Sequence, residues 1–255
     1  MTNLQTHLEN IIRQAGAMAM EMRPHLEVQR KDDGTVVTQA DVAVENLLRK
    51  RLLELLPESD FLGEEIKAEI NGIEGYTWVV DPIDGTDAFR HGLAYFGVSV
   101  GLAHDGEIVL AAFYNPMLNE LYVARKGEGA YCNGRRMQIL HGIALNEESF
   151  ALGPSDFHIH YHFSLPIKVR SLGSIAQHFA LVADGRACCA LCRPHLWDIA
   201  AGLLLVEEAG GIVRFLDGRS FSARDYLHGE LIPSPLLASP PDIWEKIAEN
   251  INWRL

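Results

Sequence analysis

Trp78-Val-Val-Asp81-Pro-Ile-Asp84-Gly-Thr86 is a short apolar strand that runs directly into two acids, a glycine and a hydroxyl. A buried strand normally avoids acids, because an unpaired buried carboxylate costs several kcal/mol of folding free energy. The two acids therefore need a cation, and a turn at the intervening proline can aim both at one point. The Gly85-Thr86 pair can offer backbone N–H groups and a hydroxyl to an anion. A cation site beside an anion site indicates metal-assisted chemistry on a phosphate.

The segments around this motif predict alternating helices and strands. Apolar residues at helical spacing predict helices over 4–18 and 42–56, the second ended by Pro57. Turn residues between apolar runs predict an antiparallel meander with strands at 96–102, 108–114, 121–124 and 130–132. In the second half we expect helices at 175–183, 198–209 and after Pro240, and strands at 187–191, 212–216 and 236–238. Residues 144–169 carry no clear pattern.

This order of elements predicts an α/β (α+β) fold with layered helices and sheets. At 255 residues the chain suits one large domain or two fused lobes. We interpret residues 1–143 as an N-terminal α+β lobe that carries the main motif. Residues 144–255 form a C-terminal α/β lobe that contributes Asp198 and substrate contacts.

The composition excludes several classes of protein. With 34 acids against 22 bases, the formal net charge is -12, so direct binding to nucleic acid or to an anionic membrane is not expected. Four cysteines do not make a disulfide scaffold in a chain of this length. The first residues lack the pattern of a signal peptide, and no apolar run approaches the roughly 20 residues of a membrane span. We therefore expect a cytoplasmic location.

Further acids extend the motif into a constellation of carboxylates. Glu64-Glu65 follows a predicted strand, Asp198 follows Trp197 at a helix start, and Asp41 begins the second helix. Oxygen-rich sites favour Mg²⁺ or Mn²⁺, and two such ions can clamp the attacking and leaving oxygens of a phosphoryl transfer. Each acid also has a simpler explanation: a capping box for Asp41, a helix-dipole partner for Asp198, and a solvated turn for the glutamates.

Three motifs, in this order and at this spacing, resemble the inositol monophosphatase family. They are Gly63-Glu64-Glu65, the segment from Trp78 to Phe89, and Trp197-Asp198-Ile-Ala-Ala-Gly202 with Glu208-Ala-Gly-Gly211. Weaker matches cover almost the whole chain. The resemblance implies a layered αβαβα sandwich and Mg²⁺-dependent hydrolysis of a small phosphate monoester. It also implies a homodimer, inhibition by lithium, and Mn²⁺ as a possible substitute for Mg²⁺.

The resemblance also implies roles for individual residues. Glu64, Asp81 and the Ile83 carbonyl would hold a first ion, and Asp81, Asp84 and Asp198 a second. A third, weaker ion would lie near Glu64, with Asp41 contributing through water. Catalysis would involve Glu64, Asp41 and Thr86, whose hydroxyl, hydrogen-bonded to Asp41, would help to deprotonate the attacking water. The substrate would contact Asp84, Asp198 and the N–H groups of Gly85 and Thr86.

The chain departs from the family pattern near the expected substrate. Many inositol-using members carry a glutamate about seven residues before the Trp-Asp aspartate, where this chain has Leu191 or Cys192. A site built to bind a hydroxyl loses selectivity without its partner, while the metal-binding residues stay intact. Arg193 and His195 can offer polar contacts instead, and Arg170 matches a position that contacts substrate in some relatives.

We therefore expect inositol monophosphate or a related polyol or sugar phosphate as substrate. Relatives with the same motifs use histidinol phosphate, fructose bisphosphate or phosphoadenosine phosphate, and these remain alternatives. A non-enzymatic alternative also remains, because some relatives act as regulatory partners of the transcription machinery independently of catalysis.

Two further clusters could bind a metal but have simpler explanations. Cys189-x-x-Cys192-x-x-His195 resembles half of a zinc site, but the segment fits a buried strand in which cysteine packs as a small apolar residue. His158-x-His160-x-His162 alternates at strand spacing, which would place the three imidazoles on one face. We interpret this triplet as a surface cluster rather than a metal site.

Overall fold

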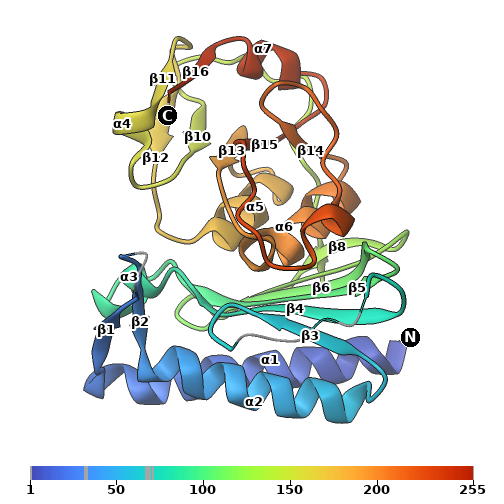
Figure 1. Cartoon of the computed structure of the whole chain (residues 1–255). Coiled ribbons are helices and arrows are strands. Elements are labelled where there is room, and N and C mark those ends of the chain that lie inside the picture. The colour runs from blue at the N-terminus through green and yellow to red at the C-terminus, as the bar shows by residue number, and fades with distance from the viewer. Residues whose placement is uncertain (1, 32–33, 67–69, 71, 255) are drawn as a thin grey trace.

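Five layers alternate between helices and sheets in the computed structural model of the chain (Figure 1), which describes residues 2–31, 34–66, 70 and 72–254. Helices α1 (Thr2–Met22) and α2 (Gln39–Leu55) cover the outer face of a seven-stranded sheet. Helices α5 (Ile175–Ala183) and α6 (Leu196–Glu208) separate this sheet from a five-stranded sheet, and α7 (Trp244–Ala248) lies beyond it. The predicted αβαβα sandwich is confirmed.

The seven-stranded sheet carries the motif that runs from Trp78 to Thr86. Its strands follow chain order: β3 (Asp60–Gly63), β4 (Tyr76–Asp84), β5 (Gly97–His104), β6 (Glu107–Asn115), β7 (Glu120–Arg125), β8 (Gly129–Cys132) and β9 (Arg135–Arg136). The pairing from β4 onward is antiparallel, as expected for a meander, and β3 runs parallel to β4. The register of β4 against β5 shifts between Asp81 and Asp84, where Pro82 has no N–H to donate. The bulge turns the strand end out of the regular ladder.

The five-stranded sheet is mixed and is built from very short strands. Its order is β12 (Lys168–Arg170), β10 (Phe150–Leu152), β13 (Cys189–Cys192), β15 (Leu236–Ser239) and β14 (Ile212–Phe215). Strand β10 runs parallel to β12 and β13, whereas β15 is antiparallel to β13 and β14. The segment 144–169, which had no clear sequence pattern, thus supplies two strands of this sheet.

Smaller elements lie at the edges of the layers. A hairpin of β1 (Val28–Arg30) and β2 (Val36–Thr38) precedes α2, and α3 (Thr86–Arg90) follows the end of β4. Single 3-10 turns occur at Arg23–His25 and Ala223–Tyr226. At the far end, β11 (Tyr161–Phe163) pairs with β16 (Ile251–Trp253). Among the described residues, we find no helix with the length and apolar character needed to span a bilayer.

The predicted strand spacing of the three histidines is wrong. His158 and His160 lie in the short helix α4 (Phe157–His160), and only His162 lies in a strand. The Asp156 carbonyl accepts the N–H groups of Ile159 and His160, and the resulting helical turn stacks Phe157 on Tyr161 with ring centroids 5.2 Å apart. Aromatic packing at helical spacing therefore outweighs the alternating pattern.

The cysteine cluster is part of the core, as predicted. Cys189 and Cys192 are 1% exposed and lie in the central strand β13, whereas His195 lies beyond the strand end, just before α6. Cysteine behaves here as a small apolar residue.

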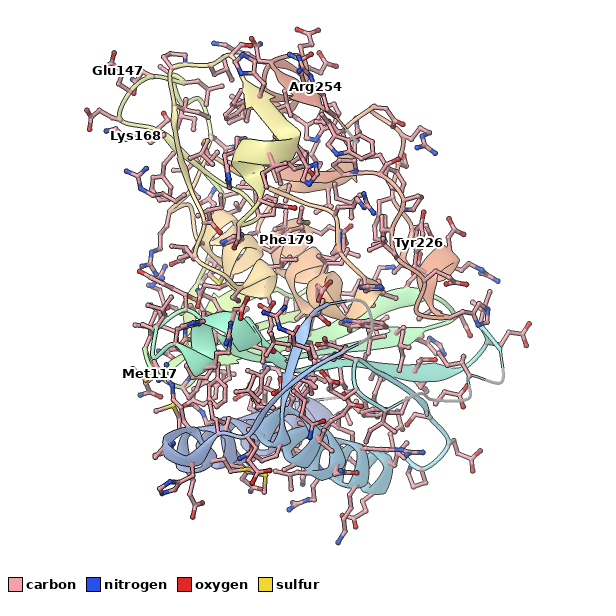
Figure 2. All side chains as sticks on the ribbon, turned by 60° about the vertical axis from the view of Figure 1, so that its left-hand side comes forward. Met117, Glu147, Lys168, Phe179, Tyr226 and Arg254 are labelled. Atoms are coloured by element: carbon pink, nitrogen blue, oxygen red, sulfur yellow. The ribbon has the colours of Figure 1, made fainter. Side chains whose placement is uncertain are left out.

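Helix α6 lies at the centre of the molecule and is buried on nearly every side. Such a helix must be apolar all round, and glycine or alanine stands wherever a neighbour comes close. A Cβ atom added to Gly202 would lie 2.5 Å from the Phe179 Cβ of α5. On the other side, a Cβ at Gly101 of β5 would lie 2.8 Å from the Ala200 Cβ. Figure 2 shows Phe179 in this middle layer between the two sheets.

Replacing Gly202 by alanine should test this close approach. Alanine is the better helix former by about 1 kcal/mol, but its methyl group would overlap Phe179 and force the helices apart. We expect Gly202→Ala to lower the free energy of unfolding by about 1–3 kcal/mol, measured by urea denaturation. Gly72→Ala is the matched control, because the nearest atom to an added Cβ there is 4.0 Å away. A Gly202→Ala protein as stable as the wild type would contradict the packing described.

Candidate metal-dependent active site

Three carboxylates from distant parts of the chain, two buried and one partly buried, meet between the sheet and the middle helices. Asp81 and Asp84 come from the bulged end of β4, and Asp198 comes from the first turn of α6. One oxygen atom from each residue lies within 4.8 Å of the others. The close packing of α6 against β5 brings the two chain segments together at this point.

The electrostatics of this cluster are unfavourable without a cation. Burial raises the pKa of Asp81 and of Asp198 well above the usual range, and the negative charge of Glu64 raises both further. Burial also raises the pKa of Asp84, to about 7, against the opposing effect of its hydrogen bonds. Three hard oxygen donors that repel one another fit a divalent cation, which would remove the repulsion and restore the charged forms.

Asp84 is fixed by the start of helix α5. Its carboxylate accepts a hydrogen bond from the Ser174 hydroxyl and from the backbone N–H groups of Ile175, at 3.0 Å, and Ala176, at 2.8 Å. Ser174 also caps α5 by accepting the Gln177 N–H at 3.0 Å. The sequence alone does not identify Ser174 as a site residue. Its position before an apolar helical run indicates a helix cap, but it does not show that the same hydroxyl binds Asp84.

Asp198 combines a helix-capping role with its place in the cluster. One of its oxygens accepts the His195 backbone N–H at 2.7 Å, as expected for an acid in the first turn of a helix. The His195 ring stacks on Trp197, with centroids 4.5 Å apart and planes 8° apart. Asp198 thus lies in the first turn of α6, as the helix-dipole explanation requires, and this role does not exclude metal binding.

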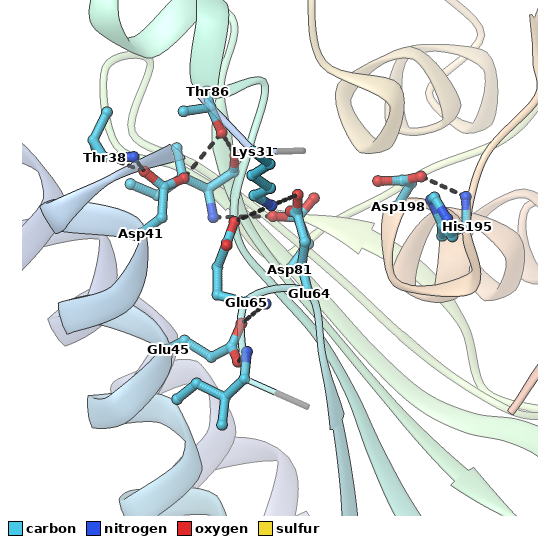
Figure 3. A network of polar contacts seen from close by, with 12 residues as sticks. Lys31, Thr38, Asp41, Glu45, Glu64, Glu65, Asp81, Thr86, His195 and Asp198 are labelled. Atoms are coloured by element: carbon cyan, nitrogen blue, oxygen red, sulfur yellow. Dashed lines mark hydrogen bonds and ion pairs between the residues drawn. The ribbon is translucent and has the colours of Figure 1, made fainter. Parts of the chain in front are cut away.

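A further buried acid, Asp41, connects the start of α2 to the motif (Figure 3). It accepts the Thr38 N–H at 2.9 Å and the Thr38 hydroxyl, which completes the predicted capping box. The Thr86 hydroxyl donates to the other oxygen of Asp41 at 2.9 Å and lies 3.1 Å from the Ile83 carbonyl oxygen. Burial is the main reason why the pKa of Asp41 is raised. The structure thus contains the Thr86–Asp41 hydrogen bond that the resemblance implies.

Glu64 and Glu65 are not a solvated turn, because Lys31 binds both of them (Figure 3). The Lys31 ammonium nitrogen lies 2.8 Å from a Glu64 oxygen and 2.7 Å from a Glu65 oxygen. Burial and the charge of Glu64 raise the pKa of Glu65 to about 7. A metal ion at Glu64 would have to compete with this ammonium group. The sequence does not predict this role of Lys31, because the residues next to it in the chain do not show which acids it binds.

Glu45 was also missed, and it supports the turn that carries Glu64 and Glu65. It is fully buried on α2, and its carboxylate accepts the backbone N–H groups of Glu65, at 2.9 Å, and Ile66, at 2.7 Å. Burial raises its pKa to about 7. A signal existed in the sequence, because Glu45 lies beside Val44 on the apolar face of a predicted helix, where glutamate is rarely buried without a partner.

The carboxylate cluster lines one open pocket of about 440 Å³. Its lining includes most of the residues predicted for catalysis and metal binding: Glu64, Asp81, Ile83, Asp84, Gly85, Thr86 and Asp198. Gly85 adopts a φ of +89°, and an added Cβ would lie 2.9 Å from the Gly173 carbonyl oxygen, so only glycine fits there. Gly85 thus allows the turn to pack against Gly173 while it lines the pocket.

The three substrate contacts predicted further along the chain do not line this pocket. Arg170 is exposed on β12, and its guanidinium donates to the Val169 carbonyl at 3.0 Å. Arg193 lines a neighbouring pocket, and His195 packs on Trp197. His195 nevertheless touches the carboxylate cluster through its backbone N–H, which donates to Asp198 at 2.7 Å.

Comparison with known proteins agrees with this geometry. The chain is 38% identical over 199 residues to an inositol-1-monophosphatase of Rhizobium meliloti, covering 73% of this chain and 74% of the relative. It is 35% identical over 220 residues to a histidinol-phosphatase of Chlorobaculum parvum, covering 82% and 84%. The solved structure of a Thermotoga maritima IMPase superposes with a TM-score of 0.84 at 28% identity, over 98% of this chain and 96% of that one.

The sequence profile of the inositol monophosphatase family matches residues 1–252, which is nearly the whole chain. The match includes both halves of the carboxylate cluster and the helices that position it. Together with the relatives described above, it identifies the reaction class as hydrolysis of phosphate monoesters. The chain belongs to the inositol monophosphatase family.

Proposed function

We propose that this chain hydrolyses a small polyol or sugar phosphate with Mg²⁺ held by its buried carboxylates. The observation that carries the proposal is the convergence of Asp81, Asp84 and Asp198, with one oxygen of each within 4.8 Å of the others. In the reaction, water adds to phosphorus and the bond between phosphorus and the ester oxygen breaks. The products are the free alcohol and hydrogen phosphate.

The proposed ligands divide into two sets that share Asp81. Glu64, Asp81 and the Ile83 carbonyl would hold one ion, and Asp81, Asp84 and Asp198 a second, with a third and weaker ion near Glu64. Bound Mg²⁺ supplies a water of lowered pKa and stabilises the leaving alkoxide. It also explains how a chain with a net charge of -12 can accept a dianionic substrate.

The remaining chemistry is proposed for side chains around the ions. Asp41 accepts a hydrogen bond from the Thr86 hydroxyl at 2.9 Å, so that the Thr86 oxygen can orient the attacking water and take its proton while passing its own proton to Asp41. The N–H groups of Gly85 and Thr86 at the start of α3 would hold the phosphate oxygens. Glu64 would act on the water together with this pair once Lys31 has moved aside.

Other properties of the family are proposed for this chain on the strength of its membership. Mn²⁺ should replace Mg²⁺, lithium should inhibit, and the protein should form a homodimer and act in the cytoplasm. For the substrate, the names of the relatives include an inositol-1-monophosphatase and a histidinol-phosphatase. Steady-state kinetics with inositol 1-phosphate, histidinol phosphate, fructose 1,6-bisphosphate and phosphoadenosine phosphate will rank them.

Replacing Asp198 by asparagine tests the metal-binding proposal directly. The asparagine carbonyl can keep the hydrogen bond from the His195 N–H, whereas the negative charge is lost. We expect Asp198→Asn to fold and to lose Mg²⁺-dependent turnover by about 10²–10³-fold, measured by phosphate release.

Asp225→Asn serves as the matched control, because Asp225 is exposed in a 3-10 turn outside the pocket. Turnover of Asp198→Asn close to that of the control would refute the proposed ligand set. A cellular role that survives Asp198→Asn would favour the protein-partner alternative.

Substitutions of Thr86 test its part in orienting water. Thr86→Ala removes the hydroxyl that bridges Asp41 and the nucleophile, and we expect kcat to fall by about 10²-fold with little change in KM. Thr86→Ser keeps the hydroxyl and should retain most of the activity. Equal losses in both variants would indicate that the methyl group, rather than the hydroxyl, is needed.

The stability of the metal-free protein should depend on pH in a defined direction. Because the folded protein raises the pKa of Asp84 to about 7 and those of Asp81 and Asp198 above the usual range, it binds protons more tightly than the unfolded chain does. Its stability should therefore fall as pH rises from about 4 towards 7 and beyond, by up to about 1.4 kcal/mol per pH unit for each such group.

Thermal unfolding between pH 5 and pH 8, with EDTA and then with Mg²⁺, measures this effect. Added Mg²⁺ should raise Tm most at the higher pH, since it competes with protons for the same oxygens. A metal-free Tm that rises with pH over this range would contradict the assigned electrostatics.

A further inference from the structure

A second pocket, of about 390 Å³, adjoins the carboxylate pocket. The two pockets share Ile175 in their linings, and the Ile175 N–H holds Asp84 at 3.0 Å. A phosphate ester bound at the carboxylates would therefore have this second pocket available for the rest of its carbon skeleton. The walls are formed by Tyr161, Trp253, Leu231 and Pro154, together with the polar side chains of Arg193, His160 and Asp156.

Arg193 is the notable charge in this pocket. It lies between the end of β13 and the start of α6 and is exposed. Within the described part of the chain, its guanidinium forms no hydrogen bond or ion pair with another residue. In a protein with a net charge of -12, an arginine that meets no acid is available to an anionic ligand.

The described acid of the pocket forms no ion pair with Arg193. Asp156, the one acid in its described lining, lies 3.5 Å from the His160 ring nitrogen, one helical turn along the chain. Leu191 and Cys192, which precede Arg193, are 2% and 1% exposed and bring no carboxylate. In inositol-using relatives a glutamate stands at this position, whereas here the apolar Leu191 or Cys192 offers Arg193 no acidic partner.

We propose that the leaving group of the true substrate carries a second anionic group, a carboxylate or a phosphate, which Arg193 binds. This inference rests on the proposed function and narrows its substrate class to doubly anionic sugar or polyol phosphates. A guanidinium can bind either anion through two parallel hydrogen bonds. The aromatic and aliphatic walls reduce the exposure of the pair to water, which strengthens it. A leaving group with an ammonium group, as in histidinol phosphate, meets the wrong charge.

A matched series of six-carbon substrates isolates this effect. Sorbitol 6-phosphate has a neutral leaving group, 6-phosphogluconate adds a carboxylate, sorbitol 1,6-bisphosphate adds a phosphate, and glucamine 6-phosphate adds an amine. We expect kcat/KM with Mg²⁺ to be highest for one of the two anionic members and lowest for the amine. The ratio between the carboxylate and the bisphosphate identifies which anion the pocket takes.

Substitutions of Arg193 then link the preference to the side chain. Arg193→Gln should lower the ratio of kcat/KM for the anionic substrate to that for sorbitol 6-phosphate by about 10- to 100-fold. Arg193→Lys should retain part of that ratio, and Arg193→Glu should shift the preference towards the amine. Arg49→Gln, an equal loss of charge on the exposed face of α2, should leave the ratio unchanged.

The possible failures are distinguishable. If no member of the series is hydrolysed with Mg²⁺, the proposed function itself is wrong. If neutral and anionic substrates are used equally well, or if Arg193→Gln lowers both by the same factor, the proposal for Arg193 is wrong and the phosphatase remains. Should Arg193→Gln fail to fold, the response of the ratio to Arg193→Lys decides the question.

Discussion

The mutual repulsion of Asp81, Asp84 and Asp198 is the constraint on which the rest of the structure depends. Three acids so close together, two of them buried, would be expelled to solvent if the fold did not hold them. The fold holds them with donors from the middle layer: the start of α5 binds Asp84, and the start of α6 binds Asp198. The two sheets enclose these helices, so the folded core provides the free energy that keeps the charges together.

Much of this could be predicted from the sequence, and the failures have physical reasons. The bounds of α5 agree with the predicted 175–183, because helical periodicity is strong over nine apolar-rich residues. Strands β10 and β12 have three residues each. These strands are too short to show a periodic pattern, so the sequence of segment 144–169 does not predict them. The alternating histidines predict a single strand, but the segment is a helix of four residues followed by a strand of three. Elements this short leave no periodicity that the sequence could reveal.

In the candidate site, too, some residues could be predicted from the sequence and others could not. Acids in motifs of fixed spacing were named from the sequence, whereas their partners were not. Ser174 meets Asp84 across 90 positions of the chain, and Lys31 meets Glu64 across 33, and neither pairing leaves a local trace. The reactive groups come mostly from the first half of the chain, whereas the second pocket is formed by residues after 150. If the two proposals hold, reaction and selectivity come from different parts of this fold, and the motif indicates only the first.

The contact between Gly202 and Phe179 has a consequence for the ion as well as for the helices. Because the backbone of α6 lies directly against a side chain of α5, the pair forms a stiff frame with no compressible layer between its members. Asp84 and Asp198 are attached to the two sides of this frame. The folded core, rather than a bound ion, therefore sets the spacing of these two carboxylates.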